Sequence, residues 1–275
     1  MDLVEFLKAA LFGLVEGVTE WLPVSSTGHM LLLQQFVSLD VSVGFWNMFL
    51  VVIQLGAILA VCVLYFGELN PFSREKDAAR RRATWSLWAK IVVACLPAAV
   101  IGIPLNDWME EHLGGPFVIA GALIVWSAAM WMADRQQNFT KGMKDVTVKD
   151  ALIIGAFQAL SPVFPGISRS GATISAGLFL KFDRVTATRL SFYMGIPSLV
   201  AAGLLEAATE ASTISNTVGW TPTIVATVVS GVVAYATIAW LLRFVSSNKF
   251  TSFLVYRVLL GLVIIALVSA GTIAA

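Results

Sequence analysis

The sequence predicts an all-α integral membrane protein, a single membrane domain with six transmembrane helices and two re-entrant helical hairpins in an inverted-topology internal repeat. Of its 275 residues, 58% are apolar and 13% are charged, whereas soluble domains are about half apolar and about a quarter charged. The charges are clustered, with nine between residues 67 and 90 and seven between residues 134 and 150. The apolar runs between clusters reach the ~20 residues that cross a bilayer. This composition excludes a disordered chain, a disulfide-rich secreted domain and most soluble enzymes.

Six apolar runs are long enough to be transmembrane helices. They lie roughly at residues 45–66, 88–105, 116–133, 190–207, 222–243 and 254–273. Two further apolar regions, 3–38 and 151–181, are broken by polar stretches, the first at Pro23–Gly28 and the second at Pro162 and Pro165–Gly171. Their halves are about 12 to 20 residues long, too short or too polar for a comfortable span. Each region therefore predicts a helical hairpin that dips into the membrane and returns.

The distribution of lysine and arginine predicts the orientation, because cytoplasmic loops carry an excess of these residues. Loops 67–87 and 134–150 are rich in both, whereas loops 106–115 and 208–221 contain neither. The first two loops are therefore expected in the cytoplasm and the last two outside. With this alternation, the two hairpins enter the membrane from opposite sides.

An internal repeat agrees with that topology. An offset of 142 residues pairs Gly13 with Gly155, Glu16 with Gln158, Thr19 with Ser161, Pro23 with Pro165 and Ser26 with Ser168. The first repeat spans about 1–133 and the second about 151–273. Each contains one hairpin and three spans, and because three is odd, the second copy is upside down relative to the first.

The hairpin tips predict an anion site, because the free N–H groups and dipole of a helix N-terminus attract negative charge. Ser25 or Ser26 can cap the second helix of the first hairpin, and Ser168 or Ser170 that of the second. The inverted arrangement would bring both helix starts together. We therefore expect a pocket for a multiply charged anion.

The titratable residues near the tips fit phosphoryl transfer. Glu16 and Glu20 are four residues apart and share one helical face. Two carboxylates inside a membrane repel each other unless a proton or a cation joins them. Mg²⁺ or Ca²⁺, which prefer oxygen ligands, is the natural cation. Ser26 and His29 are three residues apart, so the imidazole is expected to reach the hydroxyl. Arg169 offers a bidentate fork for phosphate. A nucleophile, a base, a metal and charge neutralisation are the parts that this reaction needs.

The alternative function is an inverted-repeat secondary transporter or a lipid-carrier flippase, since carriers commonly combine inverted repeats with broken helices. Glu16 and Glu20 would then form an ion site, and Arg169 would bind the substrate anion. The simpler alternatives are an interfacial position for the glutamates and a packing role for His29. The Ser26–His29 pair favours the enzyme, because a carrier needs no nucleophile.

Three motifs carry a resemblance to a known family. Glu16–His29 (EGVTEWLPVSSTGH), Phe49–Gly56 (FLVVIQLG) and Pro165–Thr173 (PGISRSGAT) resemble the motifs of the undecaprenyl-diphosphate phosphatases, the UppP/BacA family associated with bacitracin resistance. The resemblance implies hydrolysis of undecaprenyl diphosphate to undecaprenyl phosphate and inorganic phosphate, which recycles the lipid carrier of peptidoglycan synthesis. It also implies a divalent metal and a multi-pass protein of the bacterial plasma membrane whose active site opens mainly to the outer face.

The same resemblance assigns the site residues. Glu16 and Glu20 would be metal-binding or acid–base carboxylates, Ser26 the nucleophile, His29 its base or acid, and Arg169 the phosphate clamp; direct attack by water, with Ser26 only donating a hydrogen bond, stays open. The residues expected to bind the substrate are Ser25, Thr27, Gln54, Ser168, Ser170, Gly171 and Thr173. The expected partners are a polyprenyl diphosphate and membrane lipids. The net charge of +1 argues against nucleic acid, and a homodimer is left open.

Overall fold

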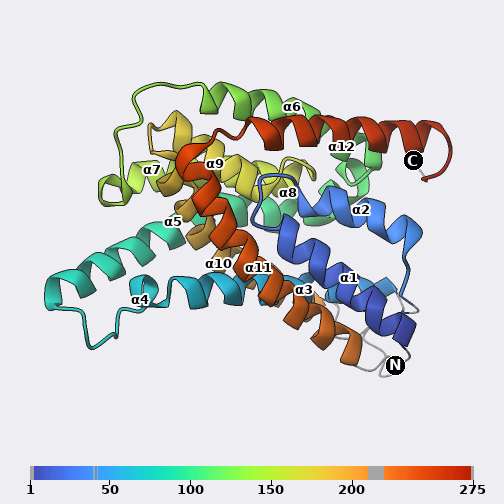
Figure 1. Cartoon of the computed structure of the whole chain (residues 1–275), viewed down its shortest axis with the longest axis horizontal. Helices are drawn as coiled ribbons and strands as arrows, with labels where there is room; N and C mark the ends of the chain where they lie inside the picture. Colours follow the sequence, from blue (N-terminus) through green and yellow to red (C-terminus); the bar gives the residue numbers. More distant parts are fainter. Residues whose placement is uncertain (1–2, 40, 42, 210–219, 274–275) are drawn as a thin grey trace.

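The structure, a computed structural model, describes residues 3–39, 41, 43–209 and 220–273, and within them every regular element is helical (Figure 1). The helices are α1 (Leu3–Thr19), α2 (Ser26–Phe36), α3 (Val43–Leu64), α4 (Phe66–Leu69), α5 (Ala78–Leu113), α6 (Pro116–Asp134), η1 (Met143–Asp145), α7 (Val148–Gln158), α8 (Leu160–Val163), α9 (Arg169–Phe179), α10 (Arg184–Thr209), α11 (Thr221–Ser247) and α12 (Thr251–Ser269). The all-α prediction is confirmed.

Five helical segments of the described chain are long and apolar enough to cross a membrane. They are Ala78–Leu105, Pro116–Asp134, Arg184–Leu205, Thr221–Ser247 and Thr251–Ser269. Each overlaps one of the predicted runs, and the remaining run, 45–66, falls on α3, whose shorter apolar stretch is Met48–Leu64. The protein is therefore a multi-pass membrane protein.

One predicted loop is wrong. Residues 106–113 continue α5 to Leu113, so only a short connection separates α5 from α6. A helix can continue beyond its apolar run because its backbone hydrogen bonds are internal. The other predicted external loop, 208–221, lies mostly outside the described residues.

Both broken regions form the expected pair of half-helices, with α1 and α2 in one and α7 and α9 in the other. The second half-helix is capped in the same way in each. Ser25 (φ 71°) accepts a hydrogen bond on Oγ from the Gly28 N–H at 3.4 Å, and Ser168 (φ 73°) accepts one from the Gly171 N–H at 3.2 Å. Of the two candidate caps at each tip, the structure therefore selects Ser25 and Ser168.

These caps correct the alignment of the hairpins by one residue. Ser168 corresponds to Ser25 and not to Ser26, although the pairing of Gly13 with Gly155 holds further from the tip. The second tip contains one residue more than the first, in the segment where the short helix α8 replaces a turn. An offset taken from the sequence before the tip therefore fails beyond it.

The first half-helix of each hairpin packs closely on a long helix. α1 lies against α11, which in turn packs on α3, and α7 lies against α5. A Cβ added at Gly13 would come 2.2 Å from the Ala226 carbonyl oxygen, and one added at Gly155 would come 2.2 Å from that of Ala94. Glycine is required at both positions, because any side chain would collide with backbone.

The remaining contacts place both tips inside the molecule. α9 packs on α10, and α12 and α6 lie side by side along one edge of the structure (Figure 1). The largest apolar cluster joins Trp21 and Leu22 of the first tip to Ile174 of α9 and Phe192 of α10. The tips are thus buried in the protein.

A hydrogen-bonded box anchors the second hairpin at its start. The Asp150 carboxylate accepts hydrogen bonds from the Thr147 N–H (3.0 Å) and hydroxyl (2.8 Å), and it pairs with Lys141 at 3.0 Å. Burial raises the pKa of Asp150, but these donors together outweigh burial and hold its pKa below the usual value. The ionised box fixes the position at which α7 begins.

We expect Gly155→Ala to lower the stability of the protein by about 1–3 kcal/mol, because the new methyl group would force α7 away from α5. Thermal unfolding of detergent-purified protein measures the loss. Gly121→Ala in α6 is the matched control, since nothing lies within 4 Å of its added Cβ. Equal stability of the two variants would contradict the close approach of α7 to α5.

Candidate active site

A cavity of about 130 Å³ lies where the two hairpin tips meet. Its lining consists of Glu20, Ser25, Ser26, Thr27, Gln54, Ser161, Gly166, Ser168, Arg169 and Leu199. The first residues of α2 and α9 are both among them, so the N-termini of the two helices face one space. This is the arrangement expected for an anion site.

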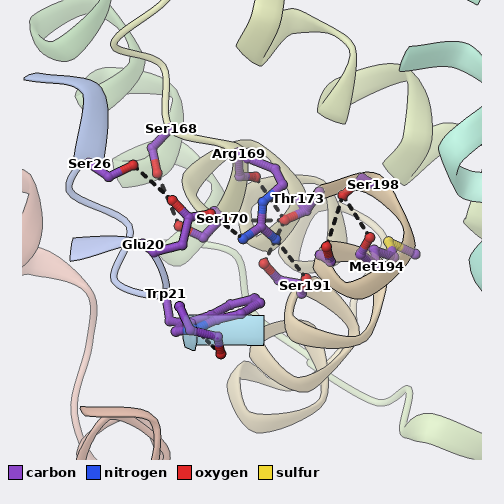
Figure 2. Close-up of polar contacts among 12 residues, drawn as sticks. Glu20, Trp21, Ser26, Ser168, Arg169, Ser170, Thr173, Ser191, Met194 and Ser198 are labelled. Carbon is purple, nitrogen blue, oxygen red and sulfur yellow. Dashed lines mark hydrogen bonds and ion pairs between the residues drawn. The ribbon is translucent and has the colours of Figure 1, made fainter. Parts of the chain in front are cut away.

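Glu20 connects the two hairpins at this cavity (Figure 2). Its Oε1 accepts a hydrogen bond from Arg169 Nη2 at 2.7 Å, and its Oε2 accepts one from the Ser26 hydroxyl at 2.8 Å. The Arg169 and Glu20 side chains are only 10% and 7% exposed. The carboxylate is therefore placed to take a proton from Ser26 while it neutralises Arg169.

Arg169 is held from three sides. Besides the bond to Glu20, Nη1 donates to the Ser191 carbonyl oxygen at 3.1 Å, and the guanidinium lies 4.8 Å from the centre of the Trp21 ring. Its Nε is buried and has no hydrogen-bond partner. The cation is thus fixed at the first turn of α9 with donor capacity left over.

Three of the predicted substrate-binding residues do not line the cavity but support the second tip. Ser170 donates to the Leu22 carbonyl oxygen of the first tip at 2.9 Å and lies 3.0 Å from the Ser168 hydroxyl. Thr173 donates to the Ser191 hydroxyl at 2.7 Å, which ties α9 to α10. The Gly171 N–H is the donor of the cap at Ser168. The cavity itself is lined by Ser25, Thr27, Gln54 and Ser168, as predicted.

The predicted contact between His29 and Ser26 is wrong. His29 Nδ1 lies 2.7 Å from the Ser25 carbonyl oxygen, and Nε2 lies 2.6 Å from the Tyr256 hydroxyl of α12, whose ring stacks on the imidazole at 5.5 Å. Because a carbonyl only accepts, Nδ1 carries the proton, and in the neutral ring Nε2 accepts from Tyr256. The bond between Nδ1 and the Ser25 carbonyl holds the imidazole toward α12. The Ser26 hydroxyl bonds Glu20 and not His29.

Glu16 lies beside Glu20, outside the cavity lining. It is buried, and its Oε1 has no hydrogen-bond partner; both polar atoms of the Gln158 amide are unpartnered as well. No group of three or more His, Cys, Asp or Glu side chains with metal-binding geometry occurs among the described residues. Two carboxylates with one free oxygen nevertheless fit Mg²⁺ or Ca²⁺, which complete their coordination with water and substrate phosphate.

Sequence reasoning missed two residues of α12, Tyr256 and Arg257. The Tyr256 hydroxyl meets His29, and the fully buried Arg257 contacts both hairpin tips. Tyr256 gave no signal, because a tyrosine in a span is common near the membrane interface. Arg257 did give one, since it is the single charged residue of the apolar run 254–273, and a charge inside a span is a functional-site candidate by default.

Comparisons with known proteins agree on one family. The model of the family described as bacitracin resistance protein BacA matches residues 9–263. The undecaprenyl-diphosphatase of Cutibacterium acnes is 47% identical over 99% of this chain and 100% of its own length. Those of Enterococcus faecalis (44% identical; 94% of this chain, 95% of the relative) and Lacticaseibacillus paracasei (42% identical; 95% and 97%) are similar over nearly the same extent.

The Glu20–Arg169 pair predicts a non-additive effect on stability. Glu20→Gln leaves Arg169 buried without its counter-ion and should cost about 3–5 kcal/mol, whereas the double variant with Arg169→Met should recover much of that loss. Thermal unfolding in detergent measures both.

Glu5→Gln is the control for removing a carboxylate, because its pair with Lys8 is partly exposed and should contribute about 0–1 kcal/mol. Simple additivity of the two single changes at Glu20 and Arg169 would contradict the buried pair.

Proposed function

Because the chain belongs to the family of the bacitracin resistance protein BacA, we propose that it is an undecaprenyl-diphosphatase. It hydrolyses undecaprenyl diphosphate to undecaprenyl phosphate and inorganic phosphate, and so returns the lipid carrier to peptidoglycan synthesis. One observation carries the proposal from the structure: Ser26, Glu20 and Arg169 are hydrogen-bonded in series at a cavity between two helix N-termini. A nucleophile, a base and a phosphate-binding cation thus share one space.

Binding begins with the terminal phosphate at the N-termini of α2 and α9. Their free N–H groups and the Arg169 guanidinium supply positive charge where the phosphate oxygens lie. As Arg169 turns its fork toward the phosphate, it gives up part of its bond to Glu20 Oε1. The Glu20 carboxylate then becomes a better proton acceptor.

The chemical step starts at Ser26. Glu20 takes the hydroxyl proton through the 2.8 Å hydrogen bond as Ser26 Oγ attacks the terminal phosphorus, and the bridging P–O bond breaks to release undecaprenyl phosphate. Water then attacks the phosphoserine, which frees inorganic phosphate and restores the Ser26 hydroxyl. His29 bonds Tyr256 and the backbone, so it takes no proton from Ser26 in this route.

Glu16 and Glu20 are the residues that would hold a divalent cation, Mg²⁺ or Ca²⁺, in this proposal. When bound, the cation would supply charge neutralisation for the diphosphate. The unpartnered Oε1 of Glu16 beside Glu20 supports this assignment, because a buried carboxylate oxygen without a donor calls for a cation or a proton.

The membrane arrangement belongs to the same proposal. Six spans and two re-entrant hairpins form inverted repeats at about 1–133 and 151–273 in the bacterial plasma membrane, with the site open mainly to the outer face. The identical serine caps and the paired glycine contacts of the two hairpins support the repeat. The polyprenyl tail of the substrate lies among the lipid-facing helices, and a homodimer is compatible with this arrangement.

Release of phosphate from undecaprenyl diphosphate by detergent-purified protein tests the activity. We expect release that stops with EDTA, returns with added Mg²⁺ or Ca²⁺, and is lost in Arg169→Ala. If folded protein releases no phosphate with any divalent metal, the proposed activity is wrong. Measuring flux in proteoliposomes would then test the transporter or flippase alternative.

Ser26→Ala tests the covalent route. We expect kcat to fall at least about 10³-fold, since only oriented binding and charge stabilisation remain. Ser246→Ala, an exposed serine near the end of α11, is the control and should keep wild-type kcat. A Ser26→Ala enzyme with near-normal turnover would exclude the phosphoserine and favour direct attack by water.

A further inference from the structure

Arg257 of α12 is a buried cation without a carboxylate partner. Its side chain is 0% exposed, and none of the ion pairs among the described residues includes it. A buried charge without a counter-ion is costly unless it serves a purpose beyond packing. Arg257 has no role in the catalytic steps proposed for Ser26, Glu20 and Arg169.

The guanidinium uses all three of its nitrogens on neutral acceptors from three elements. Nη1 donates to the Pro23 carbonyl oxygen at 3.2 Å, Nη2 to the Gly166 carbonyl oxygen at 3.1 Å, and Nε to the Ser127 hydroxyl of α6 at 3.2 Å. Pro23 belongs to the first hairpin tip and Gly166 to the second. One side chain therefore joins both tips to the α6–α12 edge.

The two carbonyls occupy equivalent places in the hairpins. Pro23 lies two residues before the cap Ser25, and Gly166 lies two residues before the cap Ser168. Both caps have nearly the same left-handed backbone. Since the two Nη atoms of a guanidinium are held at a fixed separation, bonding the same carbonyl in each tip sets the distance between the two helix starts.

We propose that Arg257 is a positioning residue that holds the N-termini of α2 and α9 at the spacing at which both face one phosphate group. This inference rests on the proposed function. The positive charge of Arg257 also lies next to the cavity, because its Nη2 bonds the carbonyl oxygen of Gly166, which lines the cavity. The incoming diphosphate supplies the negative charge that Arg257 lacks in the protein itself.

The chemistry of the side chain explains why arginine is needed. Lysine would keep the positive charge, but its single ammonium group cannot present two donors at a fixed separation to two carbonyls. Methionine fills a similar space without charge or donors. Loss of the cation leaves the Pro23 and Gly166 carbonyls without this donor, which costs stability, but it leaves no buried charge unpaired. Activity and stability are therefore measured separately.

The test compares Arg257→Lys and Arg257→Met with Arg243→Met, an exposed arginine of α11. We expect kcat for a polyprenyl diphosphate to fall about 100-fold in Arg257→Met, the scale expected for a misplacement of about 1 Å. Arg257→Lys should have a KM close to that of the wild type and a kcat about tenfold lower. Lysine keeps the positive charge but does not fix the distance between the N-termini of α2 and α9. Arg243→Met should match the wild type.

A second measurement needs no turnover. Inorganic pyrophosphate should raise the unfolding temperature of the wild type, and this shift should shrink in Arg257→Met, corresponding to at least a tenfold weaker Kd. If Arg257→Met does not fold, the split between kcat and KM in Arg257→Lys decides the question.

The outcomes separate the two proposals. A wild-type protein that neither hydrolyses the lipid nor responds to pyrophosphate overturns the proposed function. An active wild type whose Arg257→Met and Arg257→Lys variants keep its kcat and pyrophosphate shift overturns the role of Arg257. A lower unfolding temperature with unchanged kcat would likewise reduce Arg257 to a structural contact and overturn the positioning role.

Discussion

A helix that ends inside a protein leaves backbone groups that need partners, and this constraint shapes the two hairpin tips. Each hairpin tip solves it with the other tip or with a neighbouring helix. Ser25 and Ser168 cap their own helices, Ser170 bonds the Leu22 carbonyl across the gap, and Arg257 bonds a carbonyl in each tip. The N–H groups left at the helix starts then have an anion as their natural partner. The site is therefore a by-product of satisfying the broken backbone.

The pair of Glu20 and Arg169 links that backbone geometry to the chemistry. In the free protein the Glu20 carboxylate neutralises Arg169 and at the same time accepts a hydrogen bond from the Ser26 hydroxyl. Neither charge can leave without a replacement, because both side chains are nearly buried. A phosphate group is such a replacement for the carboxylate at Arg169. In the proposed mechanism, substrate binding and activation of Ser26 are therefore one exchange of partners.

Much of this could be predicted from the sequence, because hydropathy, loop charge and the two broken motifs report directly on membrane depth. The spans and most of the cavity lining follow from them. The orientation of His29 could not be predicted, since i, i+3 spacing allows contact with Ser26 but does not exclude the backbone bond that turns the ring to Tyr256. Contacts from α12 could not be predicted either, because no local pattern reports which distant helix covers a tip. The one-residue slip at α8 has the same origin, a tip whose length is decided by packing.

At the two hairpin tips Arg257 bonds main-chain carbonyls and not side chains, which has an evolutionary consequence. A backbone carbonyl is present whatever residue carries it, so substitutions at the tips can change the chemistry of the site without removing the two acceptors of Arg257. The two hairpins were thereby free to specialise: one carries Glu16 where the other carries Gln158, and the other carries Arg169 where the first carries Ser26. Two hairpins of the same design can in this way carry carboxylates in one copy and a cation in the other.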